Sequence, residues 1–149
     1  MGFYMKIDFL CIHKKTIQKI KMNDNEKLPI KTHVVNIKKA ELKKKGFNDL
    51  EDWKQNPQHM YIGRNMEIYV KGAQGSKWRN PFPIKKYGLE KCLELYENHI
   101  RTTELYSQLD ELQNKVLGCW CSPSPCHGDV LCRLLREKTG QPDITEYFS

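Results

Sequence analysis

Short apolar runs along the chain predict four β-strands. Alternating, β-branched residues at 32–37 predict the first strand of a domain. Two further runs, HMYIGRN at 59–65 and MEIYV at 66–70, predict a strand, a turn and a second strand. The run KVLGCWC at 115–121 predicts a buried strand, because it is continuously apolar and bounded by polar residues.

Apolar residues that recur every three or four positions predict helices between and after these strands. They are Leu89, Leu93, Tyr96 and Ile100, then Leu105, Leu109 and Leu112, and finally Val130, Leu131, Leu134 and Leu135. Residues 40–55 are mostly polar, which predicts a short helix, a break at Gly46 and a helical turn. Glycines and prolines in 71–88 predict a loop. The last helix is expected to end near Gly140.

Strands that alternate with helices predict an α/β fold, here a small single-domain sandwich with a mixed, partly parallel sheet and flanking helices. The 149 residues suffice for one hydrophobic core but not for a second of similar size. We expect a basic N-terminal extension at 1–30, the α/β domain at 31–138 and a tail at 139–149.

The positive charge of the chain is concentrated near its start. Residues 1–45 hold twelve lysines and four acidic residues, a surplus of +8, whereas residues 46–149 hold thirteen basic and fourteen acidic residues, a net −1. Lysine runs attract phosphate backbones through salt-sensitive, non-specific forces. The same composition also fits a solvated face with no partner. Both interpretations remain open from charge alone.

The sequence predicts an intracellular protein, nuclear or cytoplasmic rather than secreted, with no membrane partner. No apolar run approaches the roughly 20 residues that span a bilayer. The opening segment, MGFYMKIDFLCIHKK, matches a signal peptide poorly, because Lys6 and Asp8 interrupt its apolar patch. In a reducing compartment the six cysteines do not imply disulfides.

The segment GCWCSPSPCHGDVL at 118–131 holds the densest cluster of reactive side chains. It joins a predicted strand to a predicted helix, where α/β proteins commonly bind ligands. Cys119, Cys121, Cys126 and His127 have the chemistry of zinc ligands. Their spacing is unusual, since structural zinc sites generally use two ligand pairs far apart in the chain. Zinc is therefore an alternative, and no cofactor is required.

A second interpretation treats the same segment as an anion-binding helix start. The amides of His127, Gly128 and Asp129 would face a phosphate or carboxylate. His127 would then act as acid–base, Asp129 would activate or merely cap the helix, and Cys126 would have a lowered pKa. A third interpretation is purely structural, with buried thiols and a proline-fixed corner.

The segment GSKWRNPF at 75–82 combines hydrogen-bond donors with aromatic faces, as nucleic-acid-binding loops do. The basic side chains would hold an anion, and the aromatic rings would stack on a base. The alternative is a turn whose aromatic residues are anchored in the core. With Arg64, at the end of a predicted strand, and the helix start, the predicted ligand-binding residues are Arg64, Ser76, Lys77, Trp78, Asn80 and Gly128.

Four motifs in order, YIGR, GSKWRNPF, LGCWC and PCHGDVL, resemble the family called domain of unknown function 4326 over about residues 32–138. Arg79 stands where that family usually has glycine. The Cys-His helix start is also similar to that of domain of unknown function 488, whose motif ends in Cys-His-Arg. These resemblances imply an α/β fold with a shared site that includes Arg64, Lys77, Asn80, His127 and Asp129.

The tail, TGQPDITEYFS, resembles the PIP box, a peptide that binds the sliding clamp PCNA. Gln141, Ile144, Tyr147 and Phe148 fit the pattern Q-x-x-aliphatic-x-x-aromatic-aromatic. In a single 3₁₀ turn the three apolar residues would share one face and fill a groove. The alternative is a tail that packs on its own domain.

Together these features predict a nucleotide- or nucleic-acid-processing domain that the clamp recruits to DNA replication or repair. The reaction would be hydrolysis or transfer at a phosphate or glycosidic bond, with His127, Asp129 and Cys126 as catalytic residues. One alternative is a non-catalytic adaptor that binds DNA and the clamp and has a structural or zinc-bound cysteine loop. A second is an enzyme of small-molecule nucleotide metabolism.

Overall fold

The computed structural model describes residues 31–141, in which three strands are interleaved with helices. In chain order the elements are β1 His33–Asn36, α2 Lys39–Lys44, α3 Leu50–Trp53, β2 His59–Tyr61, α4 Ile84–Tyr87, α5 Leu89–Thr102, α6 Leu105–Gln108, the 3₁₀ helix η1 Leu109–Leu112, β3 Val116–Cys119 and α7 His127–Thr139. The α/β class that the sequence predicts is therefore confirmed.

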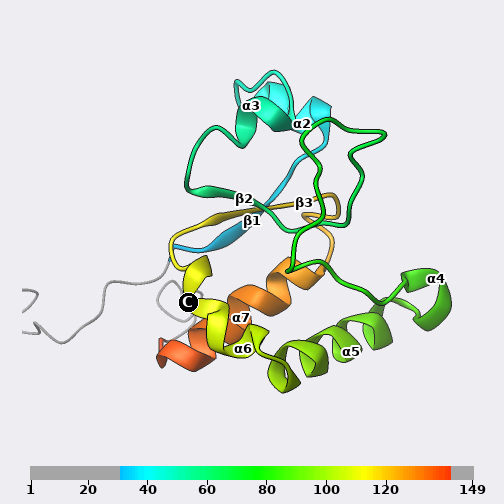
Figure 1. The fold of residues 1–149 in the computed structure, drawn as a ribbon, viewed down its shortest axis with the longest axis vertical. Coiled ribbons are helices and arrows are strands. Elements are labelled where there is room, and N and C mark those ends of the chain that lie inside the picture. The colour runs from blue at the N-terminus through cyan, green and yellow to red at the C-terminus, as the bar shows by residue number, and fades with distance from the viewer. Residues whose placement is uncertain (1–30, 142–149) are drawn as a thin grey trace, which may run out of the picture.

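The strands form a three-stranded sheet in the order β1-β3-β2, with β3 at its centre (Figure 1). Both outer strands pair with β3 in parallel, and Val116 is opposite His33 on one side and His59 on the other. The prediction of a mixed sheet was wrong for the described residues. The 66–70 segment, expected to add a strand, instead forms turns, in which the amides of Tyr69 and Val70 donate to the carbonyl of Met66.

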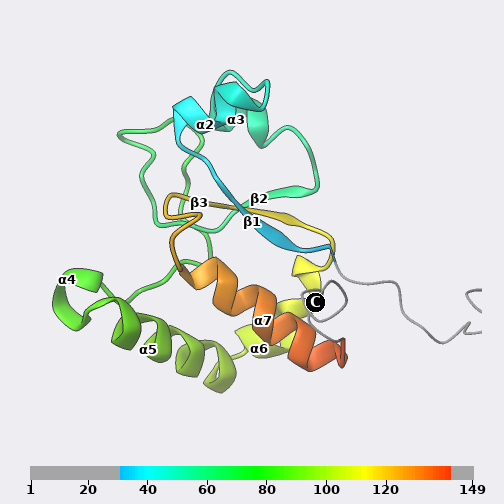
Figure 2. The same ribbon diagram turned by 180° about the vertical axis from the view of Figure 1, so that it is seen from behind.

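Helices cover both faces of the sheet. Helices α2 and α3 lie on one side, and α5, α6 and α7 lie on the other (Figures 1 and 2). Each side has its own hydrophobic cluster, one around Trp53 and Leu42 and the other around Leu117, Tyr96 and Leu131. The sequence of β3 is continuously apolar because the strand is buried on both faces.

Glycine at position 118 allows α3 to approach the middle of β3. A Cβ atom there would lie 2.7 Å from Ile37 Cγ2 and 2.8 Å from the Trp53 ring. Such contacts are far shorter than van der Waals distances, so no larger residue fits without displacing this layer. The close packing fixes the position of Cys119, which ends β3.

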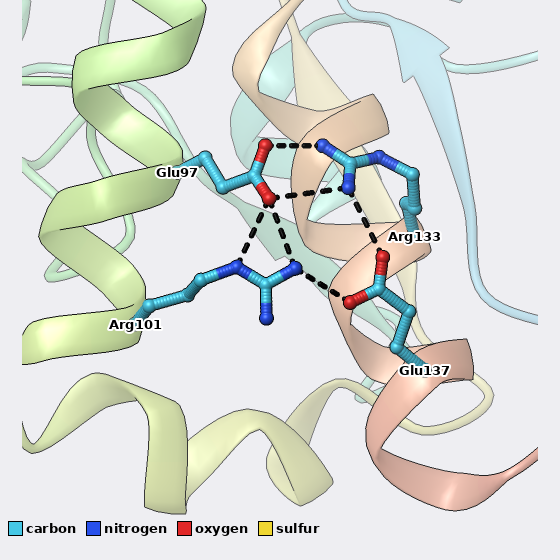
Figure 3. Close-up of polar contacts among 4 residues, drawn as sticks. All are labelled: Glu97, Arg101, Arg133 and Glu137. Atoms are coloured by element: carbon cyan, nitrogen blue, oxygen red, sulfur yellow. Dashed lines mark hydrogen bonds and ion pairs between the residues drawn. The ribbon is translucent and has the colours of Figure 1, made fainter.

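An ion-pair network joins α5 to α7 on the outer surface (Figure 3). Glu97 of α5 pairs with Arg133 of α7 at 2.6 Å and with Arg101 of its own helix at 2.9 Å. Glu137 of α7 pairs with Arg101 at 2.6 Å and with Arg133 at 3.1 Å. Each carboxylate therefore contacts both guanidinium groups, and two of the four pairs cross between the helices.

We expect Glu97→Gln to lower the free energy of unfolding by about 1 kcal/mol at neutral pH, since networked surface pairs contribute at that level. Hydrogen bonds from Arg133 and Arg101 hold the pKa of Glu97 below its ordinary value of 4.5. The contribution is therefore present above pH 4.5 and lost as the pH falls further.

Urea unfolding at neutral and at acid pH measures this effect. Glu94→Gln is the matched control, because the partner of Glu94 is Lys91 on the same helix. Equal destabilisation by the two variants, or a Glu97→Gln effect that persists in acid, would contradict the assignment of this stability to the network.

Candidate functional site

A cleft of about 470 Å³ opens where the carboxyl ends of β2 and β3 meet the start of α7. Parallel α/β sheets commonly bind ligands at this position. Its walls come from the segment after β2, the segment after β3, the loop before α4 and the first turns of α5. Six of the predicted site residues line it together, namely Arg64, Asn80, Cys119, Cys121, Cys126 and His127.

Cys126 is the N-cap of α7, and its buried thiol closes a capping box with Asp129. The Asp129 carboxylate accepts a hydrogen bond from the Cys126 amide at 2.9 Å. A hydrogen bond from the Cys119 thiol holds the pKa of Cys126 below its usual range, and bonds from the amides of Asp129 and Gly128 lower this pKa further. These bonds favour the thiolate form of Cys126 at the helix start, beside the carboxylate of Asp129.

Two residues at the helix start have structural contacts. Asp129, predicted either to activate a substrate or to cap the helix, uses its carboxylate to cap the helix and does not line the cleft. Gly128, predicted to admit a ligand, faces the sheet, where a Cβ would lie 2.7 Å from Val34 and 2.9 Å from Ile62. Its small size lets α7 pack on the sheet.

Cys119 ends β3 and is buried, with only 2 % of its surface exposed. Its hydrogen bond to Cys126, followed by burial, raises the pKa of its thiol. Cys119 is therefore the donor and Cys126 the acceptor in this pair of thiols. Cys121, the next cysteine along the chain, is exposed.

His127 is held in one orientation by the backbone after β2. Its Nε2 lies 2.8 Å from the carbonyl oxygen of Ile62. A carbonyl only accepts hydrogen bonds, so Nε2 carries the proton and Nδ1 has the lone pair. The ring also packs edge-on against Tyr96, with the centroids 5.2 Å apart. Burial lowers the pKa of His127, which favours the neutral imidazole.

Cys119, Cys126 and His127 form a compact cluster of potential metal ligands. Their two Sγ atoms and one imidazole nitrogen all lie within 4.8 Å of one another. Cys121, the fourth ligand expected from the sequence, does not belong to this cluster. The three side chains also line the cleft, so the cluster faces the space that a ligand would occupy.

Arg64 holds the loop that forms the opposite wall of the cleft. Its Nε donates to the carbonyl of Asn80 at 2.9 Å, and its Nη2 donates to the carbonyl of Phe82 at 3.1 Å. The Arg64 carbonyl accepts from the Tyr61 hydroxyl at 2.6 Å, which in turn accepts from Trp120 Nε1 at 3.0 Å. Both strand ends and the loop are thereby tied together.

The Asn80 amide also shapes this loop. Its Nδ2 donates to Cys92 Sγ at 3.1 Å, and its Oδ1 accepts from the amide of Phe82 at 2.9 Å. Asn80 therefore borders the cleft chiefly as a structural residue.

Ser76, Lys77 and Trp78, expected to bind the ligand, lie away from the cleft. Lys77 Nζ donates to Gln108 at 2.6 Å and pairs with Glu111. Ser76 Oγ accepts from the amide of Trp78 at 3.1 Å. Trp78 is 1 % exposed and belongs to the core beside α7. The alternative of a core-anchored turn describes Trp78 correctly, and Arg64, Lys77 and His127 do not converge on one point.

Sequence reasoning missed Trp120 and Lys85, which also line the cleft. Trp120 follows the last residue of β3, so its place at a strand end, where α/β proteins commonly bind ligands, was the signal that could have found it. The apolar wall is completed by Met66, Val70, Phe82, Pro83, Ile84, Leu89 and Leu93. Of these, Met66, Ile84 and Leu89 are exposed by 38–50 %, which is unusual for large apolar side chains and marks a candidate ligand surface.

Residues 47–137 match the family model described as domain of unknown function (DUF4326). The chain belongs to this family. The matched span includes Arg64, Cys119, Cys126 and His127, so the whole cleft lies within the family domain.

Two viral proteins are similar to this member of the family. Uncharacterized protein R718 of Acanthamoeba polyphaga mimivirus is 37 % identical over 86 residues, which is 52 % of this chain and 66 % of the relative. An uncharacterized 12.4 kDa protein in the nrdA-td intergenic region of Enterobacteria phage T4 is 30 % identical over 67 residues, 42 % of this chain and 62 % of the relative. The match thus covers less than two thirds of each relative. No solved structure matches the chain.

Within residues 31–141, none of the helices combines the length and apolar character needed to cross a membrane.

Proposed function

We propose that this family member is an enzyme that processes a nucleotide or nucleic acid in the cleft, by hydrolysis or transfer at a phosphate or glycosidic bond. One observation carries the proposal. A cation, Arg64, and the reactive pair Cys126 and His127 line the same cleft at the strand ends. The proposed recruitment to DNA replication or repair by a sliding clamp rests on the tail motif.

The walls of the cleft suit a ligand with an aromatic part and an anionic part. A volume of about 470 Å³ falls within the usual range for small-molecule sites. Phe82, Trp120 and the aliphatic wall offer apolar contact to a base. Arg64 uses two of its five N–H donors on loop carbonyls, which leaves donors for a phosphate within the described structure. Lys85 adds a second positive charge.

Isothermal titration calorimetry with the nucleoside 5′-monophosphates and their parent nucleosides tests the proposal. We expect the phosphate to strengthen binding at least tenfold, and Arg64→Ala to remove this advantage. The matched control is Arg79→Ala, because Arg79 is exposed, bonds the Ser76 carbonyl and lies outside the cleft. Absence of binding by wild-type protein to nucleotides and short oligonucleotides would refute the proposal.

The adaptor hypothesis predicts that Arg64→Ala has no effect on ligand binding and that the lysines near the start of the chain matter instead. DNA binding would fall when the lysines in residues 1–45 are neutralised, would be strongly salt-dependent and would tolerate Arg64→Ala. An enzyme confined to small-molecule nucleotide metabolism would bind nucleotides in the cleft but would not bind the clamp. The similarity to domain of unknown function 488 stays a prediction, as does clamp binding, since residues 142–149 lie outside the described residues.

A further inference from the structure

We propose that Cys119, Cys126 and His127 bind one zinc ion, with the fourth coordination position open to the cleft. The three side chains come from two elements, the end of β3 and the start of α7. Their ligand atoms lie within 4.8 Å of one another. Two thiolates and an imidazole are ligands that Zn²⁺ prefers.

The spacing of the three ligands is close to that of a tetrahedral site. Zn–S bonds of ~2.3 Å and Zn–N bonds of ~2.0 Å place tetrahedral ligand atoms ~3.5–3.8 Å apart. The observed limit of 4.8 Å therefore requires a contraction of ~1.3 Å at most. Rotation of the two cysteine side chains would supply that movement while the His127 ring keeps its hydrogen bond to Ile62.

The hydrogen bond of His127 leaves its other ring nitrogen available to a metal. Its Nε2–H donates to the Ile62 carbonyl at 2.8 Å, so the ring is fixed and Nδ1 keeps its lone pair. Metal-binding histidines characteristically donate their second ring N–H to a carbonyl or carboxylate in this way. The edge contact with Tyr96 further restricts the ring.

The described residues supply three ligands rather than four. Cys121 is exposed and outside the cluster, and the Asp129 carboxylate caps α7. Because all three ligands line the cleft, the remaining position faces that space. Three protein ligands and an open position are typical of catalytic zinc sites, whereas structural sites have four protein ligands.

A catalytic role of the zinc rests on the proposed function, but zinc binding itself does not. A zinc ion held by Cys119, Cys126 and His127 would lower the pKa of its bound water and so would supply hydroxide. The hydroxide oxygen would bond to the phosphorus or anomeric carbon. The leaving group would depart with the electron pair of the broken bond and take a proton from solvent. His127 would then serve as a ligand rather than as the acid–base.

Zinc content of the full chain, purified under reducing conditions without a metal-affinity tag or added zinc, tests the proposal. We expect about one zinc per chain in the wild type and less than about a tenth of that in Cys119→Ser and Cys126→Ser. Cys121→Ser is the matched control, since it removes a thiol of the same segment that lies outside the three-ligand cluster. Cys11→Ser controls for the cysteine outside the described residues.

Cobalt substitution provides a second readout for variants that fold poorly. Co²⁺ bound by two thiolates gives intense sulfur-to-metal charge-transfer absorption and tetrahedral d–d bands. We expect both in the wild type and in Cys121→Ser, a weaker charge-transfer band or none in Cys119→Ser, and altered d–d bands in His127→Gln. Wild-type protein without zinc and without these bands would overturn the proposal, as would equal losses in the Cys121→Ser control.

The Arg64→Ala variant separates this inference from the proposed function. Arg64 is not part of the ligand cluster, so the variant should keep its zinc even where nucleotide binding is lost. A zinc-loaded protein that binds no nucleotide would refute the proposed function alone. A nucleotide-binding protein without zinc would refute the metal site alone.

Discussion

Replacement of Trp78 by alanine is expected to lower the free energy of unfolding by about 3–5 kcal/mol, the usual cost of emptying a buried tryptophan site. Trp78 is 1 % exposed and lies in the cluster that joins α5, α7 and β3. Its carbonyl also accepts a hydrogen bond from Tyr96 at 2.7 Å. Tyr96 packs against His127, so we expect the loss of packing at Trp78 to loosen the support of the His127 ring as well.

The Trp78→Phe variant separates the contribution of apolar packing to stability from the effect of the polar indole N–H. The indole Nε1 of Trp78 is buried and has no hydrogen-bond partner among the described residues. Phenylalanine keeps most of the buried apolar surface and removes this unsatisfied donor, so we expect it to cost less than half as much as alanine. Urea denaturation followed by circular dichroism measures both variants.

The same variants test the placement of Trp78 against its predicted role in ligand stacking. If Trp78 is a core residue, Trp78→Ala should lower the free energy of unfolding, and Trp78→Phe should leave nucleotide affinity unaltered. If Trp78 stacks on the ligand, Trp78→Ala should have a small effect on the free energy of unfolding and should cause a large loss of nucleotide affinity. A stability loss below about 1 kcal/mol in Trp78→Ala would contradict the buried position.

Elements were predicted correctly where the pattern of apolar and polar residues matched the burial of the element in the fold. The run at 115–121 is apolar because β3 is buried on both faces, so its pattern matched its environment. The run at 66–70 is equally apolar but pairs with no strand in the described structure. Ile68 and Tyr69 are 93 % and 81 % exposed there. Hydrophobic periodicity carries no information on whether a neighbouring strand is available.

Prediction of the site residues from the sequence succeeded and failed for similar reasons. Arg64, Cys126 and His127 could be placed together because each adjoins a strand end or the following helix start, and parallel strands bring these points to one edge. Lys77 could not be excluded, because its direction depends on Glu111, 34 residues away. The role of Gly128 depends on Val34 across the helix–sheet interface, a contact that no local pattern records.

Ligand spacing along the chain also proved a poor guide to ligand spacing in space. Cys119 and Cys121 both belong to the run that was expected to form one strand, but β3 ends at Cys119. Cys121 lines the cleft but lies outside the ligand cluster, whereas Cys126 joins Cys119 in that cluster at the start of α7. The compact segment yields three clustered ligands, a set that suits an open metal site better than a structural one.

Binding to the sliding clamp is the prediction with the largest expected effect on recruitment. The motif Gln141, Ile144, Tyr147 and Phe148 predicts that the two aromatic side chains enter a groove of PCNA together with Ile144. Aromatic anchors of this kind commonly contribute at least ~2 kcal/mol each. We therefore expect Tyr147→Ala/Phe148→Ala to weaken binding by more than about 100-fold.

Calorimetry of the full chain against PCNA measures this loss. Glu146→Ala is the matched control, because position 146 lies between the motif residues and outside the predicted apolar face, so its affinity should stay within about threefold of wild type. The Arg64→Ala variant should bind the clamp normally, since the tail and the cleft use different residues. Failure of the wild type to bind PCNA would refute the proposed recruitment to replication or repair. It would not bear on the proposed chemistry of the cleft or on the zinc site, which have separate tests.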